Sequence, residues 1–308
     1  MPINTVLYDR YPVTVLSVSG TTRFLARLLA CDHRKLPVGQ AVRAVMLNAS
    51  AGVIDTVVLA RVTQDDYRII LSGDGADARE AWIRQVSAAF DAEVLSSKQL
   101  ACDFLGTLPI DGVELKRGSY QEMSGIGFVN LGWKKTVFGP KENIESLCEN
   151  LVKAGAKKGA EGGIDALRIL AREPALGLEY DESTSPLECG LEEALDFEDK
   201  SRVFIGRALC EEYRNSGKYE RLQLVAFDSA FDPNALTQIP MVVVGEYGFE
   251  VSSLVRVPEL NLTAALVRLP HEVKVGDHLG AIVNTEPACG CDGCLVVAPV
   301  LKNLSKSD

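Results

Sequence analysis

Residues 46–62 read MLNASAGVIDTVVLARV, and this stretch decides the expected fold. The small residues from Ala49 to Gly52 favour a tight turn, and a β-branched, apolar run follows them. We therefore expect two strands, over residues 41–48 and 52–62, joined by that turn. Asp55 interrupts the second strand, although Asp is depleted in strands and its charge is unfavourable in apolar surroundings. Either Asp55 faces water at a strand edge, or another group requires a carboxylate at that place.

The segments on either side extend this hairpin into a larger α+β unit. Strands are expected over residues 12–18, 67–72 and 92–97, because these runs alternate or are rich in β-branched residues. Helical spacing of apolar residues predicts one helix before the hairpin and one after it, with the faces Phe24, Leu25, Leu28, Leu29 and Trp82, Ile83, Val86, Phe90. The resulting order is strand, helix, strand, strand, strand, helix, strand. It is that of a ferredoxin-like βαββαβ unit with one added strand.

The remainder of the chain separates into a helical part and a β part. Ile144, Leu147, Cys148 and Leu151 predict an amphipathic helix, and further helices are expected over about 163–172 and 204–213. Strand candidates then cover residues 222–228, 241–245, 249–257, 261–269, 278–283 and 294–301. We therefore expect an α+β protein of three domains: a ferredoxin-like domain over 1–98, an irregular α/β domain over 99–214, and a C-terminal β-barrel over 215–308.

The composition limits the kinds of partner that the protein can have. The 308 residues carry a formal net charge of −10, with 47% hydrophobic and 24% charged residues, as in ordinary globular proteins. Nucleic acids and anionic membranes require clustered Lys and Arg, so neither is expected as a partner. The sequence has no signal-peptide pattern and no apolar run of the roughly 18 residues that span a bilayer. A cytoplasmic location with reduced thiols is expected.

Two stretches resemble the aminomethyltransferase family, the T-protein of the glycine cleavage system. The first lies within residues 163–209, where Asp165-Ala166-Leu167-Arg168, Ser185-Pro186-Leu187-Glu188 and Gly206-Arg207-Ala208-Leu209 are similar to family motifs. The second is the opening hairpin, since the family writes MLNxxGGVIDDL and this chain writes MLNASAGVIDTV. The segment that precedes the first strand in family members has no counterpart, so a trimmed first domain is expected.

The resemblance implies a three-domain fold and a folate-dependent activity. Family members bind tetrahydrofolate in a central hole and transfer a one-carbon unit from an aminomethyl group on a lipoyl carrier protein. By this resemblance Asp55 is the catalytic candidate, where a carboxylate stabilises a developing positive charge. The implied cofactor-binding residues are Met46, Asn48, Asp55 and Glu188, although Glu188 is equally expected to stabilise its own loop. The implied partners are a folate-like small molecule and a lipoyl carrier.

Three positions depart from the family pattern. Arg43 replaces a Tyr, Thr136 replaces a Glu, and Ile164 replaces an Arg. Each lost charge-assisted hydrogen bond to a pterin ring would cost about 1.5–3 kcal/mol. The segment Trp133-Lys134-Lys135 is either a new anion-binding edge or a solvated loop. Arg168 is expected in a structural ion pair.

The C-terminal region contains three closely spaced cysteines, Cys289, Cys291 and Cys294. Three thiolates on a glycine-rich turn can ligate zinc or an iron–sulfur cluster when a fourth ligand is present, and His271 and His278 are candidates for it. The alternatives are a redox-reactive turn and a loop with free thiols.

Two functions therefore remain open. The first is folate-dependent one-carbon transfer with Asp55 at the reacting centre. The second is a catalytically degenerate T-protein-like scaffold that acts in ligand binding or assembly, with a metal at the cysteine cluster as one form of it.

Overall fold

The computed structural model describes residues 4–20, 22–73, 75–90 and 92–299. The chain divides into two compact units, each made of several stretches of sequence. Unit 1 consists of Met1–Leu47, Ile54–Ile164 and Ala194–Ile205, and unit 2 consists of Asn48–Val53, Asp165–Glu193 and Gly206–Asp308. The three-domain boundaries at 98/99 and 214/215 stay a prediction.

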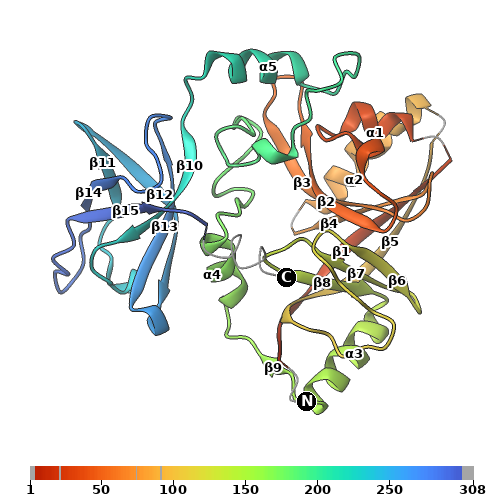
Figure 1. The fold of residues 1–308 in the computed structure, drawn as a ribbon, viewed down its shortest axis with the longest axis horizontal. Coiled ribbons are helices and arrows are strands. Elements are labelled where there is room, and N and C mark those ends of the chain that lie inside the picture. Colours follow the sequence, from red (N-terminus) through yellow and green to blue (C-terminus); the bar gives the residue numbers. More distant parts are fainter. Residues whose placement is uncertain (1–3, 21, 74, 91, 300–308) are drawn as a thin grey trace. The chain divides into compact units, whose positions relative to one another are not determined.

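Unit 1 is built on one curled sheet (Figure 1). Across the described part of the sheet the strands run β2 (Gln40–Leu47), β3 (Val53–Arg61), β4 (Tyr67–Ser72), β1 (Thr5–Ser19), β5 (Glu93–Gly106), β8 (Lys135–Gly139), β7 (Ile126–Asn130) and β6 (Tyr120–Met123). The short strand β9 (Lys157–Lys158) pairs in parallel with the start of β1. The element order from β1 to β5 confirms the expected ferredoxin-like sequence of strands and helices.

Strand β5 is longer than the sequence predicts. We expected a short strand over residues 92–97, but β5 continues to Gly106. Its first part pairs with β1, and its second part also pairs with β8, from Leu100↔Gly139 to Phe104↔Lys135. The second half is therefore held from both sides, and this pairing depends on a strand more than thirty residues away that local periodicity does not reveal.

The sheet curls until its two ends meet. The amide of Ala41 on β2 donates to the carbonyl of Gly118 (2.7 Å), and the amide of Tyr120 on β6 donates to the carbonyl of Gly39 (2.8 Å). Gly39 and Gly118 have φ of +77° and +76°, which side-chain-bearing residues rarely adopt. One buried group, which we call the inner cluster, receives side chains from all eight main strands of the sheet: Val13, Val15, Ala41, Ala60, Ile70, Ala101, Tyr120, Val129 and Phe138.

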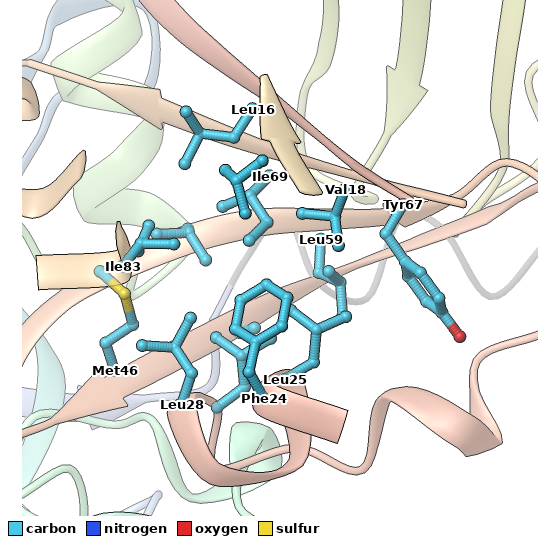
Figure 2. Close-up of a cluster of buried hydrophobic side chains, with 14 of the residues drawn as sticks. Leu16, Val18, Phe24, Leu25, Leu28, Met46, Leu59, Tyr67, Ile69 and Ile83 are labelled. Carbon is cyan, nitrogen blue, oxygen red and sulfur yellow. The ribbon is translucent and has the colours of Figure 1, made fainter. Parts of the chain in front are cut away.

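Helices cover the outer face of the curled sheet. Helices α1 (Arg23–Leu28) and α2 (Ala76–Ser87) pack on one part of it, where Figure 2 shows Phe24, Leu25 and Leu28 together with Leu59 and Ile83. Helix α3 (Lys141–Lys153) packs on another part, beside β5 and β8. Burial of one Leu, Ile or Phe side chain contributes about 1.5–3 kcal/mol to the free energy of folding. The apolar residues that predict these helices are therefore also the ones that face the sheet.

Unit 2 contains a closed β-barrel, as the sequence predicts. Its strands run β10 (Arg221–Phe227), β13 (Leu262–Leu269), β12 (Tyr247–Val257), β11 (Met241–Val244), β14 (His278–Ile282) and β15 (Gly293–Val297), and β15 pairs again with β10. Residues 300 and 301 of the expected strand 294–301 lie outside the described residues. Helix α5 (Arg207–Ser216) precedes the barrel, and α4 (Gly163–Leu170) begins at the end of unit 1 and continues into unit 2.

Short 3-10 helices complete the secondary structure, at His33–Lys35, Ala88–Phe90, Glu192–Ala194, Pro233–Ala235 and Pro258–Leu260. Within the described ranges, no helix has both the length and the apolar character to cross a membrane.

Candidate functional site

The turn of the opening hairpin is built around Asn48. Its side-chain oxygen accepts hydrogen bonds from the amides of Ser50 (3.0 Å) and Gly52 (2.9 Å), and its side-chain nitrogen donates to the carbonyl of Glu182 (2.7 Å). A Cβ atom on Gly52 would lie 1.8 Å from the Glu182 oxygen, so only glycine fits there. The side-chain amide of Asn48 therefore stabilises the turn and holds it against the loop that contains Glu182. The predicted cofactor-binding role of Asn48 stays a prediction.

Asp55 lies on the helix-covered face of β3. It shares this face with Val57 and Leu59, which belong to the core beneath α1 and α2. Its carboxylate pairs with the guanidinium of Arg79 on α2 (Nε–Oδ2, 2.7 Å) and accepts a hydrogen bond from the amide of Thr56 (Oδ1, 2.7 Å). The side chains of Asp55 and Arg79 are 7% and 6% exposed. The water-facing alternative for Asp55 is therefore wrong, because the carboxylate is buried and paired with Arg79. The catalytic and cofactor-binding roles of Asp55 stay predictions.

Arg79 is fixed from its other end as well. Its Nη2 donates to the carbonyl of Ser72 at the end of β4 (2.6 Å). Asp55 and Arg79 thus join two strands to α2 through charge-assisted bonds. Breaking such a buried pair on one side costs about 3–5 kcal/mol, because the other charge is left without a partner.

Met46 and Glu188 both have neighbours that account for them structurally. The side chain of Met46 is fully buried among the residues beneath α1 and α2, as Figure 2 shows. In unit 2, the carboxylate of Glu188 accepts hydrogen bonds from the Tyr213 hydroxyl (2.7 Å) and the Ser185 amide (3.2 Å). Glu188 therefore stabilises its own loop, which is one of the two roles expected for it. The cofactor-binding roles of both residues stay predictions.

A second buried carboxylate, which the sequence reasoning missed, lies on the inner face of the sheet. Asp103 on β5 is 3% exposed and shares its face with Ala101 of the inner cluster. It accepts hydrogen bonds from Tyr11 (3.0 Å) and Thr136 (2.5 Å) and pairs with Lys134 (2.7 Å). We call Tyr11, Asp103, Trp133, Lys134 and Thr136 the Asp103 group. The signal was present in the sequence, because Asp103 interrupts the apolar run Leu100–Leu105 as Asp55 interrupts its own strand.

The surroundings of the Asp103 group combine charge with aromatic rings. The Lys134 ammonium lies 5.3 Å from the ring centre of Trp133 and 5.9 Å from that of Tyr11, within the range of cation–π attraction. Burial raises the pKa of Tyr11 far above its usual value, so its hydroxyl stays protonated and donates to Asp103. Tyr11, Trp133 and Lys134 are half-buried, so the group has a partly open side.

Two of the positions that depart from the family pattern, Arg43 and Thr136, lie on the inner face of the sheet. Thr136 on β8 is paired in register with Asp103 on β5, so the predicted loss of a carboxylate at 136 is accompanied by a carboxylate on the adjacent strand. Arg43 alternates with Ala41 and therefore also lies on the inner face of β2. Lys134 donates to Asp103 on the inner face, whereas Lys135 donates to the Gly106 carbonyl. The solvated-loop alternative for Trp133-Lys134-Lys135 is therefore wrong, and the anion-binding edge stays a prediction.

Arg168 confirms the expected structural ion pair. It contacts the carboxylates of Glu179 (2.8 Å) and Asp165 (2.6 Å), and it donates to the hydroxyl of Ser253 (2.8 Å). Its network lies within unit 2 and joins α4 to the barrel strand β12. Ile164, at the start of α4, is half-buried and carries no polar group.

The three C-terminal cysteines lie in the barrel core. Cys291 and Cys294 are buried there, and Cys289 packs against the same cluster. Burial raises the pKa of Cys294 to about 12, which disfavours the thiolate that a metal requires. His278 pairs instead with Asp228 (2.8 Å), and His271 lies beside Glu272 (3.3 Å). Among the described residues, no three His, Cys, Asp or Glu side chains gather as a metal site would need. The metal role of these cysteines stays a prediction.

Comparison with solved structures places the fold. No protein-family model matches the sequence. The structure is similar to the crystal structure of the glycine cleavage system aminomethyltransferase T from Bartonella henselae, with a TM-score of 0.84. The match covers 98% of this chain and 87% of that chain, at 18% sequence identity. The chain therefore has a T-protein-like fold, with the mixed sheet and closed barrel expected for it.

Proposed function

We propose that this protein is a ligand-binding member of the T-protein-like fold, that it binds a folate-type ligand at the Asp103 group, and that Asp55 serves structure. The observation that carries the proposal is the difference in surroundings between the two carboxylates. The Asp55–Arg79 pair is enclosed beneath α2, whereas the Asp103 group includes half-buried aromatic rings and a half-buried cation.

The Asp103 group has the chemistry that a flat, polar, anionic ligand requires. Trp133 and Tyr11 supply half-buried aromatic rings, and Lys134, which is paired with Asp103 but 23% exposed, places a positive charge beside them. Asp103 holds Lys134, Tyr11 and Thr136 in place through three contacts to one carboxylate. A pterin ring with an acidic tail belongs to this ligand class, and the fold likeness to an aminomethyltransferase T favours it. In this proposal Asp103 is a positioning residue, and the half-buried side chains make the contact.

The surroundings of Asp55 argue against a direct role in transfer. A carboxylate stabilises a developing cation best when its charge is not already matched. Here Arg79 neutralises that charge at 2.7 Å, and the side chain is 7% exposed. Together with Arg43, Thr136 and Ile164 in place of the expected Tyr, Glu and Arg, this favours the catalytically degenerate alternative.

Two measurements on the full chain test the proposal. Titration calorimetry with tetrahydrofolate is expected to show saturable binding. An assay with an aminomethyl-loaded lipoyl carrier protein is expected to yield no methylene-tetrahydrofolate. If no heat of binding is detected at high micromolar protein, the proposal that the ligand is of the folate type is wrong. If methylene-tetrahydrofolate is formed, the structural assignment of Asp55 is wrong.

The second candidate is folate-dependent one-carbon transfer with Asp55 at the reacting centre. One observation favours it: the amide of Thr56 and the guanidinium of Arg79 orient the carboxylate. This candidate predicts transfer by the wild-type protein that Asp55→Asn abolishes while leaving the protein folded. The exposed Asp111 provides a matched control, because Asp111→Asn should leave transfer unchanged.

A further inference from the structure

Two free thiols lie in the core beneath α3. Cys102 lies on β5 and Cys148 lies on α3, and both belong to one buried cluster in unit 1. They are 1% and 9% exposed, and they are close enough to share a thiol–thiol hydrogen bond. The pair therefore links a sheet strand to the helix that covers it.

The two sulfurs have different characters. The neighbouring Cys102 thiol and the positive charge of Arg10 lower the pKa of Cys148. The Cys148 sulfur and burial raise the pKa of Cys102. Cys210, by contrast, has its pKa raised to about 11 by burial. Cys148 is thus suited to be a nucleophile, and Cys102 stays a protonated thiol beside it.

We propose that Cys102 and Cys148 form a redox-active pair that a hydroperoxide converts into an intramolecular disulfide. This inference is independent of the proposed function. The Cys148 thiolate attacks one oxygen of hydrogen peroxide, which forms an S–O bond, breaks the O–O bond and releases hydroxide. The Cys102 sulfur then attacks the sulfur of the Cys148 sulfenic acid, which forms the S–S bond. The Cys102 proton leaves with the sulfenic hydroxyl as water, so two thiols are oxidised and the peroxide is reduced.

Oxidation would change the contacts of β5. The Cys102 sulfur lies 3.3 Å from the Tyr8 carbonyl oxygen and 3.5 Å from the Asp103 carbonyl oxygen, so its one proton has an acceptor in the reduced state, whereas a disulfide has no proton to donate. The new bond would also tie α3 to β5 and close a long loop of chain, which stabilises the folded state. Because Asp103 is the next residue on β5, the loss of the hydrogen bond to its carbonyl would change the contacts of Asp103 itself.

The direct test is peptide mapping of the full chain after treatment with hydrogen peroxide. Unreacted thiols are alkylated, the protein is digested, and peptides joined by disulfides are identified by mass spectrometry. We expect a Cys102–Cys148 link that dithiothreitol removes, accompanied by a higher midpoint of thermal unfolding. Cys210→Ser is the matched control and should retain the link. A different pairing, or only over-oxidised Cys148, would overturn the proposal.

Two further measurements keep the test independent of any folding defect in variants. In Cys102→Ala, peroxide should leave Cys148 as a sulfenic acid that dimedone traps. In the untreated wild-type protein, a small alkylating agent should modify Cys148 faster than Cys210. Equal or slower modification of Cys148 would contradict its assignment as the nucleophile.

Discussion

Two buried carboxylate–cation pairs occupy opposite faces of one curled sheet. On the outer face, Asp55 pairs with Arg79 beneath α2, and both side chains are less than one-tenth exposed. On the inner face, Asp103 pairs with Lys134, whose side chain is 23% exposed and lies near two aromatic rings. The comparison teaches that a carboxylate in an apolar strand can have a cation as its partner, so the pattern does not by itself identify a reacting centre. What separates the two roles is whether the surroundings leave a ligand any approach.

The largest expected effect comes from breaking the outer pair. Asp55→Ala leaves the Arg79 guanidinium buried without its carboxylate, and we expect the free energy of unfolding to fall by about 3–5 kcal/mol. Urea denaturation followed by circular dichroism measures this loss. The double variant Asp55→Leu/Arg79→Met removes both charges and should recover part of the stability. A cost below about 1 kcal/mol for Asp55→Ala would show that the pair is not enclosed.

A smaller effect is expected at the inner pair. Asp103→Asn removes the charge that Lys134, Tyr11 and Thr136 share, and hydrogen bonds to charged groups contribute about 1.5–3 kcal/mol. Lys134 can turn toward water, so the loss of stability should be smaller than at Asp55. Urea denaturation of the two variants, Asp55→Ala and Asp103→Asn, under the same conditions tests this order. The reverse order would break the comparison between the two faces.

His33 is a buried base for which the described residues form no ion pair, and it extends the same comparison. His33 is 3% exposed, and burial lowers its pKa from 6.5 to about 4, so the folded state keeps it neutral. Between these two values the unfolded chain binds the proton and the folded chain does not, so stability falls as the pH falls. From about pH 7 to about pH 5 this contributes a loss of about 2 kcal/mol.

The control for this prediction is His33→Gln, which keeps a polar side chain that does not titrate. Its urea midpoint should change less between the two pH values than that of the wild-type protein. An identical change in both proteins would show that His33 is protonated without cost in the folded state.

The smallest effect is expected from chelation. Among the described residues no cluster of three potential ligands is present, and Cys291 and Cys294 are core residues of the barrel. We expect EDTA to leave the midpoint of thermal unfolding unchanged. A clear decrease, absent in a Cys289→Ser/Cys291→Ser/Cys294→Ser variant, would instead support the metal hypothesis.

The sequence predicts the fold well where local patterns carry the information. The hairpin, the helices α1 to α3 and the barrel strands follow from period-two or helical spacing and from turn residues. The second half of β5 does not follow from them, because it depends on pairing with β8. Contacts between distant strands leave little trace in a local window.

The candidate site is predicted less completely, for a related reason. Asp55 stands out as a carboxylate in an apolar strand, but its partner Arg79 lies on a helix beyond the next strand, and no local pattern joins them. Asp103 also interrupts an apolar strand, but the residues of the Asp103 group can be recognised as neighbours only once the pairing of β1, β5 and β8 is known. The resemblance indicates which residues occupy family positions, whereas the structure determines which charges are already matched.

The central claim is tested most directly by comparing tetrahydrofolate affinity in Asp103→Asn and Asp55→Asn by titration calorimetry, with Asp111→Asn as the control. Loss of the bonds that position Lys134 and Tyr11 should weaken binding by about tenfold or more in Asp103→Asn. Asp55→Asn, if folded, should bind within about twofold of the wild-type protein, as should the control. Weakened binding in Asp55→Asn together with unchanged binding in Asp103→Asn would contradict the account.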